Sequence, residues 1–366
     1  MNSPRTVHET CLLARAVVFS AILGLQGVTA EEERPDVPFA NGDIVVRTQK
    51  CLSLFRDRTQ VTTFGAAWHI GADDRGRLWA GAVDEDKIRL RCYTSTAEYE
   101  EYVTSPEADG IQLHKVLYWD NSVYVLYSVS WEGVADGPWT VQTETAGRIR
   151  GRWVHVVSLN PSTGSFGRPI PLSDFFGRPE IVLPSRKLVD GRPLPKGVRD
   201  TVLDLGLWDA TITPSGKLWL STQAKITSYR LGGLPAGLAK LLGPVETEGL
   251  GQRTQKIDWW ISRHGNGTGI VALSDTEIAV VNGNPPGGIT IVNTLDPPSS
   301  VQLTQSVFPD APPKWGLRPV IDVGDAILVA HAHADVAAIY RVSKVTGAVS
   351  TFASNIVASE MVQIRK

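Results

Sequence analysis

The chain has 366 residues, a formal net charge of −2 and a charged fraction of 20%. Because residues of both signs are interspersed, the composition argues against a nucleic-acid partner, which needs a basic stripe. At this length one large all-β domain is as compatible as two smaller domains.

Residues 1–30 have the pattern of a cleavable signal peptide. Arg5 and Arg15 precede an apolar run over 16–25, and the small residues of 28–30 follow it. The run is too short to span a hydrocarbon core of about 30 Å. We therefore expect an exported chain, secreted or periplasmic, whose mature part is monomeric and does not span a membrane. An uncleaved N-terminal anchor is the alternative.

A short hairpin recurs after this segment. Its clearest copies are 70–81 and 210–221, in which an apolar strand, a polar turn and a second apolar strand follow one another. Looser copies occupy 116–125, 271–280 and 320–329. The Asp, Asn, Ser, Pro and Gly residues at the turns supply the positive φ angles and local hydrogen bonds that tight hairpins need. Such a repeat indicates a repeated β-architecture.

Weaker outer strands follow each hairpin, and long helical periodicity is absent, so each unit has the four antiparallel strands of a propeller blade. Residues 42–47 resemble a second strand without a first, and 360–364 resemble a first strand without a second. Joining the two ends hides both edges and completes a sixth blade. The sequence therefore predicts an all-β, six-bladed propeller over 31–366. Its expected blades are 43–64 with 358–366, 65–104, 110–172, 204–246, 255–305 and 316–357.

The repeat also bears on the cysteines that remain after the signal peptide, Cys51 and Cys92. An exported chain with two cysteines favours a disulfide. However, the repeat places both residues on equivalent strands of neighbouring blades, too far apart to pair. We expect two free, half-buried thiols, with a disulfide as the alternative.

The hairpin over 73–79 resembles the Asp-x-x-Gly-x-Leu-Trp hairpin of six-bladed propellers of the SMP-30/gluconolactonase and NHL-repeat type. The resemblance covers most of the mature chain and implies the fold. Gluconolactonases hold a divalent metal with Glu and Asn/Asp at the starts of inner strands. The corresponding positions here are Trp68, Leu113, Trp208, Thr268, Leu317 and Ser359. None is a carboxylate, so the metal site of that family does not carry over.

The long connections of the expected propeller all fall on one face. They span 132–152, 173–203, 246–258 and 307–315. Long loops on a rigid scaffold are where binding residues concentrate, although loops also lengthen without a function. We expect a small molecule, glycan or protein to bind on this face around the central channel.

Polar residues recur where the inner strands begin. Counting nine residues back from the first apolar residue of each second strand gives His69, His114, Asp209, Gly269 and Arg318, and strand alignment adds Glu360. Equivalent positions in a ring converge on its axis, so five ionisable side chains are expected at one end of the channel. Mixed charge in such a mouth shifts pKa values and suits acid–base chemistry, anion capture or a metal. An inert, hydrogen-bonded ring is the alternative.

Two functions remain open. The first is a binding propeller without catalysis, which is favoured because no complete catalytic signature occurs. The second is a hydrolase or isomerase, lactonase-like or metal-dependent. In it His69 or His114 would be the base, Asp209 or Glu360 its orienting partner, and Arg318 the anion clamp.

No cofactor is identified, although a His/Asp/Glu set is compatible with one divalent metal. The stretch His331-Ala332-His333-Ala334-Asp335 resembles the His-x-His-x-Asp motif of metallo-β-lactamase-like hydrolases, and it is a weaker metal candidate. The favoured interpretation of this stretch is a half-buried strand face.

Overall fold

The structure is a computed structural model, and only part of the chain is described. The described residues are 36–106, 110–133, 148–171, 180–182, 207–222, 226–230, 253–256, 267–282, 287–295, 299–308, 318–331 and 337–366. The expected signal peptide, 1–30, lies outside them. Within the described ranges the regular elements are all strands, which confirms the all-β prediction. No helix in these ranges is long and apolar enough to cross a membrane.

The strands form six antiparallel sheets, and the first three use the N-terminal half of the chain. The first sheet contains, in spatial order, β26 (Glu360–Gln363), β1 (Ile44–Arg47), β2 (Leu52–Arg56) and β3 (Thr59–Phe64). The second contains β4 (His69–Ala72), β5 (Leu78–Asp84), β6 (Lys87–Tyr93) and β7 (Tyr99–Thr104). The third contains β8 (Gln112–Trp119), β9 (Ser122–Gly133) and β10 (Arg148–Asn160), with β11 (Ser165–Phe166), β12 (Ile170–Pro171) and β13 (Glu180–Val182) paired along β10.

The other three sheets have four strands each. The fourth contains β14 (Leu207–Ile212), β15 (Lys217–Thr222), β16 (Ile226–Arg230) and β17 (Arg253–Lys256). The fifth contains β18 (Gly267–Ala272), β19 (Glu277–Asn282), β20 (Ile289–Asn293) and β21 (Ser299–Thr304). The sixth contains β22 (Val320–Asp322), β23 (Ala326–Ala330), β24 (Ala338–Ser343) and β25 (Val349–Ser354).

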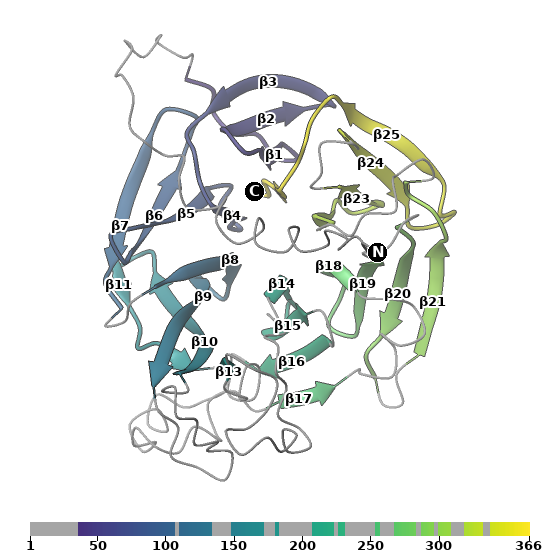
Figure 1. The fold of residues 1–366 in the computed structure, drawn as a ribbon. Helices are drawn as coiled ribbons and strands as arrows, with labels where there is room; N and C mark the ends of the chain where they lie inside the picture. Colours follow the sequence, from purple (N-terminus) through teal and green to yellow (C-terminus); the bar gives the residue numbers. More distant parts are fainter. Residues whose placement is uncertain are drawn as a thin grey trace, which may run out of the picture. The chain divides into compact units, whose positions relative to one another are not determined.

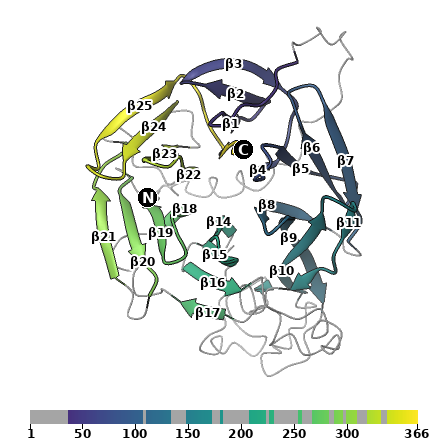
Figure 2. The same cartoon turned by 180° about the vertical axis from the view of Figure 1, so that it is seen from behind.

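The first strand of each sheet contacts the first strand of the next. These contacts run from β26 to β4, β8, β14, β18 and β22, and β22 contacts β26 again. Figures 1 and 2 show these strands around the centre, with the later strands of each sheet farther out. This is the arrangement of a β-propeller, which confirms the predicted fold type. The pairing of Glu360 in β26 with Arg47 in β1 confirms that both ends of the described chain share one sheet.

The motif residues explain why the hairpins form. The buried carboxylate of Asp73 accepts the backbone N–H groups of Arg75 and Arg77 at 3.0 and 2.9 Å. It also accepts the indole N–H of Trp79 at 3.0 Å, which ties the turn to a fully buried ring. Gly76 has a φ of 77°, in the region that favours glycine. The motif therefore encodes a self-capped turn attached to the core.

The hydrophobic core lies between neighbouring sheets. Trp79 of β5 packs in one cluster with Val116 of β8 and Val123 of β9, all nearly fully buried. Backbones also approach closely, because a Cβ on Gly71 would lie only 2.7 Å from the carbonyl oxygen of Val116. Full burial of a side chain such as valine contributes about 1.5–3 kcal/mol. This packing holds the starts of the inner strands in fixed positions.

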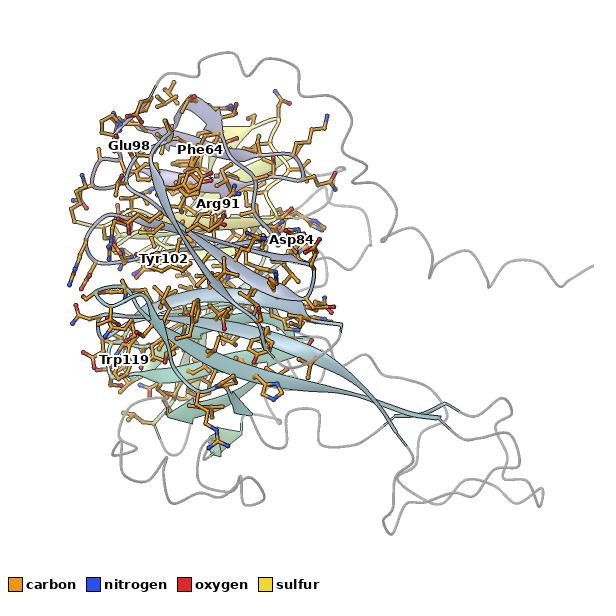
Figure 3. The ribbon with its side chains drawn as sticks, turned by 90° about the vertical axis from the view of Figure 1, so that its left-hand side faces the viewer. Phe64, Asp84, Arg91, Glu98, Tyr102 and Trp119 are labelled. Carbon is orange, nitrogen blue, oxygen red and sulfur yellow. The ribbon has the colours of Figure 1, made fainter. Side chains whose placement is uncertain are left out.

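The third sheet extends farther than the sequence predicted. Residues 132–133 and 148–152 of the expected connection belong to the paired strands β9 and β10, and β13 lies within the expected connection 173–203. Figure 3 shows this β9–β10 hairpin projecting beyond the other sheets, away from the end that carries Trp119. In the same way β17 lies inside the expected connection 246–258. These boundaries were wrong because the missed strand segments, such as 148–152 and 253–256, are largely polar and so lack the apolar pattern from which strands are predicted.

Both remaining cysteines are free, as expected. Cys51 is half-buried, but Cys92 on β6 is fully buried, which differs from the expectation. Burial raises the pKa of Cys92 to about 12. Its thiol is therefore protonated at neutral pH and a poor nucleophile.

Candidate functional site

Five charged or polar side chains meet where the inner strands begin. We call them the inner-strand cluster, and they are Arg47, His69, Lys115, Asp209 and Glu360. Gln112 at the start of β8 pairs with Ser128 of β9, and β9 then continues into the projecting hairpin. The cluster and the β9–β10 hairpin therefore lie toward the same face.

Lys115 bridges two carboxylates from different sheets. Its Nζ lies 2.8 Å from Oδ1 of Asp209 and 2.9 Å from Oε1 of Glu360. The backbone N–H of Ile270 donates to Oδ2 of Asp209 at 3.0 Å, and that of Ile70 donates to Oε2 of Glu360 at 2.9 Å. Asp209 is 8% exposed and Glu360 is 4% exposed. Buried carboxylates persist only with such partners, so Lys115 is the counter-ion that allows both.

His69 also contacts Glu360. Its Nδ1 lies 3.2 Å from Oε2 of Glu360, and Nε of Arg47 lies 3.6 Å from the same oxygen. A carboxylate beside Nδ1 favours a proton on that nitrogen, which leaves Nε2 as an acceptor in the neutral ring. The side chain of His69 is 23% exposed, so solvent or a ligand can reach it.

Burial and pairing compete in setting the pKa values of the cluster. Burial alone would raise the pKa of Glu360, but Lys115 and His69 outweigh it and hold the pKa well below its usual range. Burial alone would lower the pKa of Lys115, but the two carboxylates outweigh it and raise the pKa above its ordinary value. For Asp209 burial prevails, and its pKa is raised despite Lys115. Lys115 and Glu360 are therefore a charged pair at neutral pH.

The register explains why Lys115, and not His114, joins the cluster. His69 pairs with Gly81 and Asp209 with Ser221, in each case three residues after the first apolar residue of the second strand. The equivalent pair in the third sheet is Lys115 with Leu126. Five residues separate Ala72 from its partner Leu78, whereas four separate Tyr118 from its partner Val123. Counting back nine residues therefore lands one position too early in the third sheet.

His114 lies in a register irregularity of β8, between Leu113 and Lys115. Its Nε2 is 2.8 Å from Oγ of Ser128 on β9. The expected position of His114 in the ring is thus corrected to Lys115. The two-residue turn Asp120-Asn121, with φ angles of 47° and 56°, is the sequence signal that could have revealed this shift.

The same one-residue shift affects Arg318. Four residues separate Asp322 from its partner Ile327, so the residue opposite Ala330 is Pro319. Arg318 is fully buried, and its guanidinium carbon lies 4.8 Å from the centre of the Phe308 ring. Burial lowers the pKa of Arg318 to about 10. Arg318, the expected anion clamp, therefore contacts the ring of Phe308 and is not a member of the cluster.

Gly269 holds its predicted place, opposite Val281 in β19. A Cβ there would overlap the carbonyl oxygen of Arg318, so glycine allows the neighbouring backbone to approach. His69, Asp209 and Glu360 are the expected ionisable residues that the structure brings together through Lys115. Arg47 and Lys115 are the members that the sequence reasoning missed.

The cluster does not fit a divalent metal. The ammonium of Lys115 lies between the two carboxylates, where a cation bound by both would have to lie. Among the described residues no group of three His, Cys, Asp or Glu side chains could hold a metal ion. His331 is buried in a T-shaped contact with Phe308, at 5.6 Å between ring centroids, while His333 and Asp335 lie outside the described residues.

An exposed aromatic side chain stands next to the cluster. Trp68 directly precedes His69 and is 42% exposed. Its backbone N–H donates to the carbonyl of Gly81 at 2.8 Å, so its backbone is held at the start of β4. Trp68 and His69 are therefore consecutive residues on a fixed backbone at the start of β4, and the side chains of both are accessible.

The sequence matches no model of a protein family and no curated protein. Solved structures are similar in fold. A protein of unknown function from Bacteroides caccae has a TM-score of 0.50 and 7% identity, over 89% of this chain and 100% of that chain. A protein assigned as a 6-phosphogluconolactonase from Bacteroides fragilis has a TM-score of 0.45 and 8% identity, over 88% of this chain and 97% of that chain. A protein assigned as a gluconolactonase has a TM-score of 0.42 and 14% identity, over 81% of this chain and 88% of that chain. At these identities the similarity is one of fold alone.

Proposed function

We propose that this chain is an exported six-bladed β-propeller that binds a small polar molecule, or the end of a glycan, at the mouth of its central channel. The observation that carries the proposal is the exposure of Trp68 and His69 beside a cluster whose charges already neutralise one another. Six blades are supported by the six sheets and by the contacts from β22 back to β26. Export is supported by the signal-peptide pattern of 1–30.

The charge balance of the cluster favours binding over catalysis. Arg47 and Lys115 both lie beside the carboxylate of Glu360, and Lys115 also contacts Asp209, so each of these groups already has a polar partner within the cluster. Groups that are paired in this way hold the inner strands together, and they have little capacity left to stabilise a new charge on a substrate. The cluster is then a rigid base for the side chains above it.

The exposed pair defines the ligand chemistry. A tryptophan face stacks on a flat ring or on the apolar face of a sugar. The Nε2 of His69 would accept a hydrogen bond from a hydroxyl group of the same ligand. A ring that carries hydroxyl groups matches both contacts, and it needs no charge.

An array of mono- and oligosaccharides, followed by calorimetric titration of the bound members, tests this proposal. Trp68→Ala and His69→Gln should each weaken binding about ten-fold, as expected for the loss of about 1.4 kcal/mol. The matched control is Tyr99→Ala, which removes an aromatic ring that is 48% exposed on the outer strand β7. Affinity that is unchanged in Trp68→Ala would contradict the proposal.

A hydrolase or isomerase is the second candidate, supported by the 3.2 Å contact between Nδ1 of His69 and Glu360. A carboxylate that orients a histidine is a recurrent feature of general bases. A screen of lactones and phosphate esters with wild-type protein and His69→Gln separates the two functions. Turnover that depends on His69 would favour the enzyme, whereas saccharide binding without turnover would favour the binding protein.

A further inference from the structure

A pocket lies between the first and sixth sheets, at the opposite end of β26 from the cluster. Glu360, the first residue of β26, belongs to the cluster, whereas Gln363, its last residue, lines the pocket. Three strand steps separate the two positions by about 10 Å. We propose that this pocket is a second ligand site, for a small organic anion with an apolar ring. The proposal is independent of the saccharide site.

The floor of the pocket is apolar and well packed. The pocket has a volume of about 200 Å³. Ile44, Phe55 and Leu328 line it and are only 4%, 4% and 1% exposed. Phe352 from β25 packs on Phe55 with 6.2 Å between ring centroids and an angle of 51° between the rings. The base of the pocket is therefore fixed by buried side chains of two sheets, and the half-buried Val323 and Phe352 present its accessible apolar surface.

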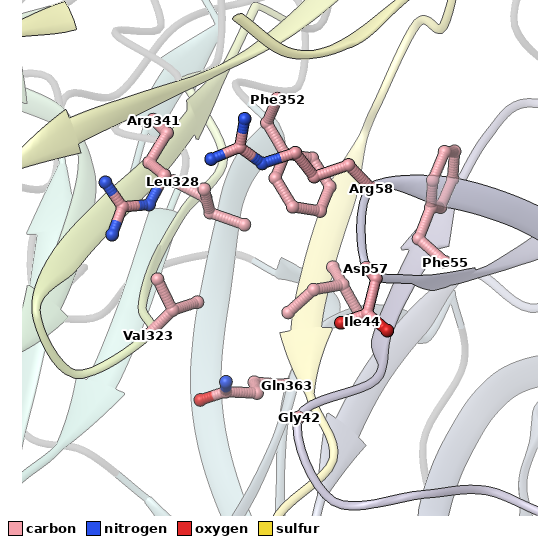
Figure 4. A pocket seen from close by; sticks show the side chains of 10 residues that line it. All are labelled: Gly42, Ile44, Phe55, Asp57, Arg58, Val323, Leu328, Arg341, Phe352 and Gln363. Atoms are coloured by element: carbon pink, nitrogen blue, oxygen red, sulfur yellow. The ribbon is translucent and has the colours of Figure 1, made fainter. Parts of the chain in front are cut away.

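The rim of the pocket carries two guanidinium groups. Arg58 belongs to the two-residue turn Asp57-Arg58, whose φ angles are 48° and 68°. Among the residues that the structure describes, none forms a hydrogen bond or ion pair with its guanidinium. Arg341 lies on β24 and forms an ion pair with Asp325. In Figure 4 the side chain of Arg58 extends across the view toward the strand that carries Arg341, whereas the guanidinium of Arg341 turns away from Arg58.

Gln363 adds a further donor. Nε of Arg365 donates to Oε1 of Gln363 at 3.1 Å, so the acceptor end of the amide is engaged. The amide nitrogen of Gln363 then remains to donate a hydrogen bond. Figure 4 shows this amide facing the pocket below the arginines. Guanidinium and amide hydrogen-bond donors thus line a pocket whose floor is apolar.

This combination selects the ligand class. Guanidinium groups bind carboxylate and phosphate oxygens through paired hydrogen bonds. The volume is below the roughly 300–1,000 Å³ of drug-sized sites, so it suits a fragment with a single ring. Asp57 also lines the pocket, and its carboxylate would repel a second negative charge. The expected ligand is therefore a monoanion such as an aromatic carboxylate.

Titration of the full mature chain with benzoate, monitored by calorimetry or NMR shifts, tests this site. Wild-type protein should bind benzoate with a Kd on the order of 1 mM, and it should bind neutral benzyl alcohol and ring-free acetate more weakly. Arg58→Ala should weaken benzoate binding about five-fold, Arg58→Lys should weaken it less, and Asp57→Asn should tighten it about two-fold.

The control for charge is Arg75→Ala, because Arg75 lies in the turn between β4 and β5 of the second sheet and donates to Asn121 at 3.2 Å. It should leave benzoate binding unchanged, and Trp68→Ala should do so as well. Absence of saturable benzoate binding by wild-type protein, or equal affinity in Arg58→Ala and Arg58→Lys, would overturn the proposal. Neither result bears on saccharide binding, so the two sites are tested separately.

Discussion

The two ends of β26 show two different uses of charge. At the end that carries Glu360, each charged side chain of the cluster has a partner of opposite charge from another strand. At the end that carries Gln363, Arg58 extends over an apolar floor without such a partner among the described residues. Charges with built-in partners stabilise contacts between sheets, whereas a charge without one is available to a ligand.

The largest expected effect is on the cluster. Lys115→Met keeps the length of the side chain but leaves Asp209 and Glu360 buried without their shared cation. The free energy of unfolding should fall by about 3–5 kcal/mol, as for other buried ion pairs that lose one partner. Urea unfolding at neutral pH measures it. Adding Asp209→Asn and Glu360→Gln to Lys115→Met should restore part of the lost free energy of unfolding. If none is restored, Lys115 does not pair directly with these carboxylates.

The pH dependence of stability gives a smaller effect. The pKa of Glu360 is lowered in the folded state, so its contribution is present above the unfolded value of about 4.3. That contribution is lost as pH falls from there toward the folded value. The stability difference between wild-type protein and Glu360→Gln should therefore narrow by about 1–2 kcal/mol between about pH 6 and pH 3. A constant difference would contradict the lowered pKa.

His114 sharpens the comparison with its neighbour Lys115. His114→Ala removes one half-buried hydrogen bond to Ser128, at 2.8 Å, and leaves the cluster intact. The free energy of unfolding should fall by about 1 kcal/mol, well below the effect of Lys115→Met. If the two substitutions have equal effects, the register of β8 is not the one described.

The smallest expected effect on stability is at the mouth of the channel. Trp68 is 42% exposed, so Trp68→Ala should change the free energy of unfolding by no more than about 0.5 kcal/mol. Urea unfolding of this variant beside Tyr99→Ala checks the expectation. A large loss would mean that Trp68 supports the fold, and a change in ligand binding could not then be assigned to contact.

The sequence was sufficient for the fold type because the hairpin motif encodes its own turn. Asp73 caps the turn and holds Trp79, and these contacts are local enough to be read from spacing. The pairing of the two end strands, later found as β1 and β26, was predicted because it hides two strand edges.

The site could be predicted only in part. Counting back a fixed number of residues from the second strand is correct only if every hairpin turn has the same length. The same count holds for His69 and Asp209, whose hairpins have equal turns, and fails where the turn is one residue shorter. A shift of one residue moves the side chain to the other face of a strand. Lys115 was therefore missed beside His114. The partner Arg47 was missed because the count considered only the starts of the inner strands, whereas Arg47 is the last residue of the second strand β1.

A double-mutant cycle on Lys115 and Glu360 tests most directly whether the inner-strand cluster is held by its own charges. The single variants Lys115→Met and Glu360→Gln and the double variant are compared with wild-type protein by urea unfolding. The exposed ion pair Arg89–Glu101, whose side chains are 32% and 29% exposed, serves as the control. The expected coupling free energy is about 1–3 kcal/mol for the buried pair and below about 0.5 kcal/mol for the control. A coupling near zero for Lys115 and Glu360 would contradict the account.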